Sequence, residues 1–122
     1  MNTKKLCVVT TTRAEYGLLK HLMHEISLST NFKLQLLVSG THLSPFHGNT
    51  IEEIKNDGFD IDAELDLKLN DDSSTGIAKS ASLALEGFTK IFEELNPDLI
   101  ILLRDRFEIL SAAIAGMFSK NP

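Results

Sequence analysis

Short, unbroken apolar runs alternate along this chain with longer stretches in which apolar residues recur every three or four positions. The runs at residues 5–10, 32–38 and 99–103 have no polar alternation, which predicts strands that are buried on both faces. Residues 61–67 alternate apolar with acidic side chains, which predicts a half-exposed strand near a sheet edge.

Helical spacing fills the stretches between and after these runs, and it predicts helices at residues 18–26, 51–56, 75–95 and 106–118. Asp57-Gly58 is a stop signal for the second helix, and Asn96-Pro97-Asp98 breaks the chain after the third. The apolar faces predicted for the first and third helices are Leu18, Leu19, Leu22, Met23 and Ile26, and Ile77, Ala81, Ala84, Phe88, Ile91 and Leu95.

Strands and helices that alternate in this way are typical of a doubly wound, Rossmann-like α/β fold with a parallel sheet. The expected strand order is 3-2-1-4, with the apolar run 99–103 at one edge. Edges of that kind are usually covered or charged. The sequence therefore indicates an incomplete domain over residues 1–122, cut short or completed by something else, and a homo-oligomer is one open alternative.

Composition narrows the function classes. The chain has 122 residues, which suits one domain, with 43% hydrophobic and 24% charged residues. A net charge of −5 argues against nucleic acid as a partner. The apolar runs are too short to span a bilayer, and no signal peptide is expected, so the predicted compartment is the cytoplasm and no membrane partner is expected. The single cysteine, Cys7, lies inside the first apolar run and is expected to be a small buried hydrophobe.

Polar segments follow three of the predicted strands, at the end of the sheet where open α/β proteins bind ligands. In the first segment, Arg13 is a cation in the first turn of a helix, where it is unfavourable unless an anion such as a phosphate binds there. Thr12 and Glu15 have the spacing of a capping box, which is the alternative explanation of this segment. The glycine-rich dinucleotide motif is missing, and Ser39-Gly40 stands where an acidic ribose ligand would be, which weighs against NAD.

The second and third segments carry the other candidate groups. His42 lies in a long loop, either as a hydrogen-bonding group at a ligand or as a solvated histidine. No histidine has carboxylate or cysteine partners in register, so no metal is expected. Asp105 and Glu108 either cap the last helix or place a carboxylate in the cleft for acid/base chemistry.

Three motifs together resemble one family. They are Thr-Arg-Ala-Glu-Tyr-Gly at 12–17, Gly-Thr-His-Leu-Ser-Pro at 40–45 with Gly-Asn-Thr at 48–50, and Asp-Arg-Phe-Glu-Ile-Leu at 105–110. In this order they resemble the hydrolysing UDP-N-acetylglucosamine 2-epimerases of sialic-acid and related nonulosonic-acid biosynthesis. The resemblance implies the N-terminal part of a glycosyltransferase-B-like two-domain fold, without the second domain.

The resemblance also implies a reaction. UDP is eliminated from UDP-N-acetylglucosamine with loss of the proton at C2, and water then adds to the glycal to give N-acetylmannosamine. No cofactor is needed. Asp105 and Glu108 are then the expected catalytic residues. The expected substrate-binding residues are Thr12, Arg13, His42 and Arg106.

The chain departs from the family pattern at Arg104, where the family usually has glycine, and it lacks the family's remaining carboxylates. Either this arginine favours the ionised carboxylate of Asp105, which works against its action as a base, or it points into solvent and changes nothing. Turnover by this chain alone is therefore not expected. Two alternatives stay open: a nucleotide-sugar-binding module without catalysis, and a relative that is specific for GDP-sugars.

Overall fold

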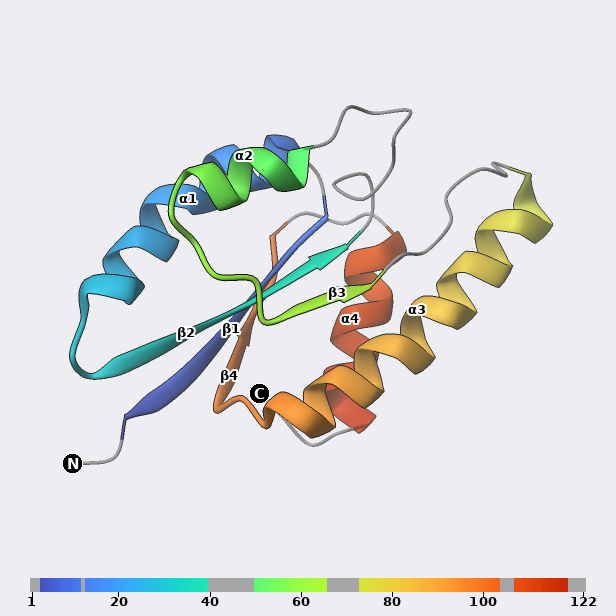
Figure 1. The fold of residues 1–122 in the computed structure, drawn as a ribbon. Helices are drawn as coiled ribbons and strands as arrows, with labels where there is room; N and C mark the ends of the chain where they lie inside the picture. Colours follow the sequence, from blue (N-terminus) through green and yellow to red (C-terminus); the bar gives the residue numbers. More distant parts are fainter. Residues whose placement is uncertain (1–2, 12, 40–49, 66–72, 104–106, 119–122) are drawn as a thin grey trace.

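The computed structural model describes residues 3–11, 13–39, 50–65, 73–103 and 107–118. Within these ranges, four parallel strands form one sheet in the order β3-β2-β1-β4 (Figure 1). The strands are β1 (Lys4–Thr10), β2 (Phe32–Ser39), β3 (Ala63–Leu65) and β4 (Leu99–Ile101). The predicted order 3-2-1-4 is confirmed.

Helices cover both faces of this sheet (Figure 1). α1 (Arg13–Leu28) and α2 (Thr50–Asn56) pack on one face, and α3 (Ser74–Leu95) and α4 (Phe107–Phe118) pack on the other. The doubly wound α/β prediction is therefore confirmed. None of the helices in the described ranges combines the length and apolar character needed to cross a bilayer.

Alternation along the central strands divides the interior into two cores. Val8 faces α1 and α2, whereas its neighbours Cys7 and Val9 face α3 and α4. Burial, together with the charge of Asp62, raises the pKa of the Cys7 thiol to about 12. The thiol is therefore protonated and enclosed at neutral pH, as expected for a small buried hydrophobe.

The predicted apolar face of α1 is only half correct. Leu19, Met23 and Ile26 are buried, but Leu18 is 62% exposed and Leu22 is 44% exposed. Only one narrow stripe of a helix can meet the sheet, so Leu18 and Leu22, which lie on one side of that stripe, remain in solvent.

The contact face of α3 is rotated from the predicted one. Ala84 and Phe88 are buried as predicted, but the face continues through Phe92, which stacks on Phe88 with ring centroids 6.1 Å apart. Ile77 is 38% exposed, because Gly76 and Ser80 occupy the buried positions of the first turns.

Both edge strands are shorter than the apolar runs predicted. Residues 61–67 yield only Ala63–Leu65, with residues 66 and 67 outside the described ranges, and residues 99–103 yield only Leu99–Ile101. An edge strand has one neighbour, and β4 stays in register with β1 only from Leu6 to Val8.

An aspartate precedes each edge strand and binds the neighbouring central strand in the same way. Asp62 Oδ2 accepts from the Leu36 N–H (2.8 Å), and the Asp62 N–H donates to the Leu36 carbonyl (2.9 Å). Asp98 Oδ2 accepts from the Lys5 N–H (2.7 Å), and the Asp98 N–H donates to the Lys5 carbonyl (2.8 Å). Each aspartate thus satisfies both backbone groups of one central residue before the ladder begins.

The predicted helix ends are confirmed. Gly58 has a φ of 91° and donates its N–H to the Lys55 carbonyl, which ends α2 with a residue that tolerates left-handed backbone. Asn96 adopts the left-handed conformation after α3 and donates to the Phe92 carbonyl. At the other end of α3, the Ser73 hydroxyl caps the helix by accepting from the Gly76 N–H (3.1 Å).

Candidate functional site

The strand order reverses at β1, because β2 lies on one side of it and β4 on the other. The chain leaves β1 into α1 on one face and leaves β4 towards α4 on the other face (Figure 1). Two helices therefore begin at the same edge of the sheet, on opposite faces. A reversal of this kind is where open parallel sheets bind ligands.

Polar side chains are fully buried at this carboxyl edge. Thr10 and Thr11 at the end of β1, Glu15 in the first turn of α1 and Ser39 at the end of β2 are each 0% exposed. The Ser39 hydroxyl donates to the Leu65 carbonyl (2.6 Å) and so joins the ends of β2 and β3. Sequence patterns did not single out Thr11 or Ser39, because a short polar residue after an apolar run gives no signal of burial.

The start of α1 is held by a carboxylate. Glu15 Oε1 accepts from the Thr11 N–H (3.1 Å) and also from the Thr11 hydroxyl. The capping-box alternative pairs Glu15 with Thr12, whereas these described bonds of Glu15 Oε1 go to Thr11. The other half of the predicted capping box, Thr12, lies outside the described residues.

The backbone places part of the predicted site. Arg13 is the first residue of α1, and Glu108 is the second residue of α4, so these two segments follow neighbouring strands at the carboxyl edge. The side chains of both are outside the described ones. The remaining predicted site residues lie wholly outside the described ranges, namely Thr12, His42, Asp105 and Arg106, together with Arg104. Their roles stay predictions.

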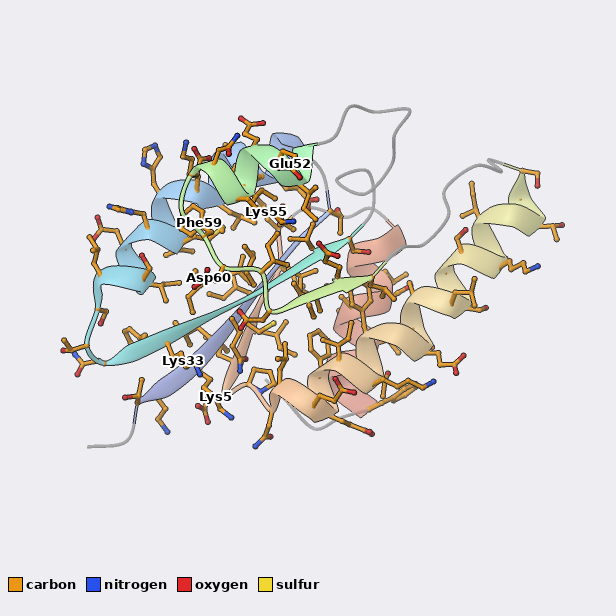
Figure 2. The ribbon with its side chains drawn as sticks, viewed as in Figure 1. Lys5, Lys33, Glu52, Lys55, Phe59 and Asp60 are labelled. Carbon is orange, nitrogen blue, oxygen red and sulfur yellow. The ribbon has the colours of Figure 1, made fainter. Side chains whose placement is uncertain are left out.

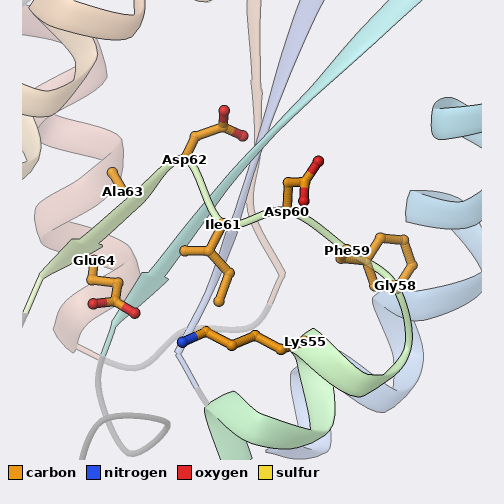
Figure 3. Close-up of a pocket in the computed structure, with 8 residues that line it drawn as sticks. All are labelled: Lys55, Gly58, Phe59, Asp60, Ile61, Asp62, Ala63 and Glu64. Atoms are coloured by element: carbon orange, nitrogen blue, oxygen red, sulfur yellow. The ribbon is translucent and has the colours of Figure 1, made fainter.

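A hollow of about 620 Å³ lies away from this edge, beside the connector between α2 and β3. It is lined by Lys55 and residues 58–64 (Figure 3). In Figure 3, Asp60 and Asp62 point to one side of the connector, and Ile61 points to the other side, towards Lys55. Asp62 is already bonded to Leu36, and the lining mixes acidic and basic groups, so the hollow has no uniform charge to select a ligand.

A second hollow, of about 630 Å³, shares residues 58–60 with the first and is also lined by His24 and Lys33. Figure 2 shows Lys33 and Lys5 near the amino ends of β2 and β1, with Phe59 and Lys55 on the α1–α2 side of the sheet. Both hollows are therefore lined in part by the connector between α2 and β3. In the described ranges, no three histidine, cysteine or acidic side chains are grouped closely enough to hold a metal ion.

A polar cluster joins α1 to the end of α2, and sequence patterns gave no sign of it. The Tyr16 hydroxyl donates to Asp57 Oδ2, and the Lys20 ammonium lies 3.1 Å from the same oxygen. The Tyr16 ring also meets Phe59 edge to face, with centroids 6.3 Å apart. We call Tyr16, Lys20, Asp57 and Phe59 the Asp57 cluster. The four residues belong to segments about forty residues apart in sequence, which is why no local pattern reveals them.

Known proteins are similar to this chain throughout its length. A family model described as UDP-N-acetylglucosamine 2-epimerase matches residues 24–122. A GDP/UDP-N,N'-diacetylbacillosamine 2-epimerase (hydrolyzing) from Campylobacter jejuni is 42% identical over 122 residues, which is 100% of this chain and 32% of that protein. A UDP-N-acetylglucosamine 2-epimerase from Neisseria meningitidis is 25% identical over 97% of this chain and 30% of that protein.

A solved structure shows the same fold. The UDP-GlcNAc 2-epimerase from Methanocaldococcus jannaschii superposes with a TM-score of 0.74 at 16% identity, over 96% of this chain and 29% of that chain. This agrees with the predicted glycosyltransferase-B-like fold for the part that is present. The chain spans about a third of the length of the curated relatives it matches.

Proposed function

Because this chain belongs to the UDP-N-acetylglucosamine 2-epimerase family, we propose that it forms the first part of the nucleotide-sugar site of a hydrolysing 2-epimerase. The observation that carries the proposal is the arrangement at the carboxyl edge. The segments that hold Arg13 and Glu108 follow adjacent strands, at the point where the strand order reverses.

In this proposal the start of α1 binds the diphosphate. The first-turn N–H groups and the positive end of the helix dipole favour an anion, and the Arg13 guanidinium supplies the full positive charge. The Glu15–Thr11 bonds fix this turn to β1, so the amides are already oriented before a ligand arrives. Thr12 and His42 are proposed as further substrate-binding groups.

The proposed chemistry takes place on the sugar. Loss of the C2 proton to a carboxylate and departure of UDP from C1 form a glycal, and addition of water across its double bond gives the 2-epimer with a free C1 hydroxyl. Asp105 and Glu108 are the proposed acid/base pair, and Arg106 is a proposed substrate contact at the start of α4. Protons balance, because the one removed from C2 is replaced from solvent when water adds.

We propose that residues 1–122 make an incomplete Rossmann-like domain that binds the nucleotide sugar but does not turn it over alone. We propose that the remaining groups of the site come from outside these residues, since the chain spans about a third of the length of its curated relatives. A cytoplasmic location fits this proposal, because nucleotide sugars are made and used there.

A second candidate substrate is an N,N'-diacetylbacillosamine carried by UDP or GDP. The observation that favours it is identity: the C. jejuni relative, whose name specifies that sugar, is 42% identical, whereas the N. meningitidis relative named for UDP-N-acetylglucosamine is 25% identical. Both sugars carry an acetamido group at C2 and differ at C4 and C6, so a site for either must recognise the 2-acetamido group and C2 proton alike.

Titration of the labelled chain in nuclear magnetic resonance tests the proposal. We expect UDP to shift the amides of residues 10–16 with a dissociation constant below about 1 mM. Titrations with GDP, with UDP-N-acetylglucosamine and with UDP-N,N'-diacetylbacillosamine are then compared, and the ligand that binds most tightly identifies the preferred nucleotide and sugar. Turnover is followed in parallel through release of UDP, and none is expected from this chain alone. Binding confined to the connector hollows, or no shift at roughly 5 mM nucleotide, would reject the proposed site.

A further inference from the structure

The seven-residue helix α2 is held to the sheet by few contacts. Only Ile51 and Ile54 of this helix belong to the buried core on the α1 side. A helix of this length is not stable by itself, so its position depends on what its two ends are attached to. One end of α2 is Thr50, and Asp57 follows its last residue at the other end.

Asp57 makes the attachment at that second end. One carboxylate oxygen receives the Tyr16 hydroxyl and the Lys20 ammonium, which are four residues apart and therefore on the same side of α1. Phe59 then packs against the Tyr16 ring. The turn after α2 is thus joined to two successive turns of α1, beginning one turn after Arg13.

The Tyr16 donor is enclosed, whereas its acceptor reaches solvent. Tyr16 is 2% exposed, and the Asp57 side chain is 24% exposed. Burial, with the bond to Asp57, raises the pKa of the Tyr16 hydroxyl above its ordinary value, so the hydroxyl is a donor at neutral pH. The bonds from Tyr16 and Lys20 lower the pKa of Asp57, so the carboxylate is ionised at neutral pH. A charged acceptor with an enclosed donor is a stronger bond than a neutral pair.

We infer that Asp57 is a positioning residue, which fixes α2 against the first turns of α1 and so controls the carboxyl edge without touching a ligand. The chemistry is that of a carboxylate joining two helices, both of which point their N-termini towards that edge (Figure 1). The effect on nucleotide binding rests on the proposed function. The effect on α2 does not.

The neighbouring carboxylate of Asp60 provides a matched control. Asp60 lies three residues along the same connector, is exposed, and makes no hydrogen bond or ion pair with any residue in the described ranges. Asp60→Asn and Asp57→Asn remove the same charge, but only the second replaces the carboxylate that Tyr16 and Lys20 bind with a neutral amide, whose oxygen is a weaker acceptor. Tyr16→Phe removes the hydroxyl and keeps the ring that packs on Phe59.

Amide hydrogen exchange of the full chain is the first measurement. In Asp57→Asn and in Tyr16→Phe we expect the amides of α2 to exchange roughly tenfold faster, which is the size of effect expected from one lost hydrogen bond. Amides of α3 are expected to keep their rates. Unchanged α2 exchange in Asp57→Asn, or an equal increase in Asp60→Asn, would overturn the inference. An equal increase in α3 would show global destabilisation and would also count against it.

Titration with UDP is the second measurement. We expect Asp57→Asn and Tyr16→Phe to weaken UDP binding several-fold while Asp60→Asn leaves it unchanged. If the unsubstituted chain does not bind UDP, the proposed function fails and the exchange experiment still decides the role of Asp57 at α2. If the unsubstituted chain binds UDP and Asp57→Asn binds it equally well, the control of the carboxyl edge is rejected.

Discussion

A methyl group added to Gly87 in α3 would lie too close to the Leu65 side chain. A Cβ at Gly87 would lie 2.5 Å from Leu65 Cδ1, 2.9 Å from Leu65 Cδ2 and 3.3 Å from Leu65 Cγ. Ordinary contacts of this kind begin at 3.4 Å. Gly87→Ala therefore requires the Leu65 side chain to move by about an ångström or more away from α3.

Two opposing contributions set the change in the free energy of unfolding that Gly87→Ala causes. Replacing glycine by alanine inside a helix stabilises it by about 0.8–1.0 kcal/mol, and forcing an extra carbon into a packed core costs about 1–3 kcal/mol. Gly17 in α1 isolates the first term, because a Cβ there would meet nothing within 4 Å. We expect Gly17→Ala to raise the free energy of unfolding by nearly the full helix term and Gly87→Ala to fall below it by about 1–3 kcal/mol.

Urea denaturation followed by circular dichroism measures both variants, provided that the slope against denaturant stays constant. The double variant Gly87→Ala with Leu65→Ala removes the obstructing atoms, and a coupling energy above about 0.5 kcal/mol would assign the cost to this pair. Two alanine variants of equal stability would refute the reasoning, since they would show that Leu65 reorients freely.

Three further predictions concern charge and association. Arg13→Ala should weaken UDP binding by about 1.5–3 kcal/mol, the range for a hydrogen bond to a charged group. Calorimetric titration of a full-length protein with UDP measures the change, and an unchanged affinity would show that Arg13 is only a solvated residue. The folded-state pKa of Asp57 is lowered by its bonds from Tyr16 and Lys20, so its stabilising contribution is present above the ordinary carboxyl pKa of about 3.9 and is lost as the pH falls through the lowered value. Thermal midpoints below about pH 4 should therefore fall less in Asp57→Asn than in the unsubstituted chain, and parallel curves would contradict this. Leu99 on edge strand β4 is 42% exposed, so the chain should associate with rising concentration, and Leu99→Lys should reduce the association. Light scattering across a dilution series measures this, and a monomer at every dilution would reject the prediction.

The fold was predictable because its strands are marked by continuous apolar runs and its helix ends by local stop signals. Asp57-Gly58 and Asn96 end α2 and α3 where their residue types favour left-handed or turn backbone. The family resemblance drawn from the three motifs is confirmed by the match over residues 24–122. These features are local, so they can be recognised before the chain is folded.

Features that depend on distant contacts were not predictable. Leu18 and Leu22 have the same periodicity as Leu19 and Met23, and only the direction from which the sheet approaches separates exposed from buried. For the same reason, the sequence could not show that Phe92, and not Ile77, belongs to the contact face of α3. The Asp57 cluster joins two helices through side chains whose positions in the sequence are unrelated. Glu15 was expected at the helix start as part of a capping box, and its carboxylate lies there, bonded to Thr11.

Asp62 and Asp98 have a consequence for how this sheet tolerates change. Each aspartate fixes the alignment of an edge strand at its amino end, through two bonds to a single residue of a central strand. Because the alignment of the edge strands is set at their amino ends, the segments that follow the strands at the opposite end of the sheet can vary in length and composition without shifting it. A fold that separates the end that sets alignment from the end that meets ligands can acquire new substrate preferences by changing loops alone.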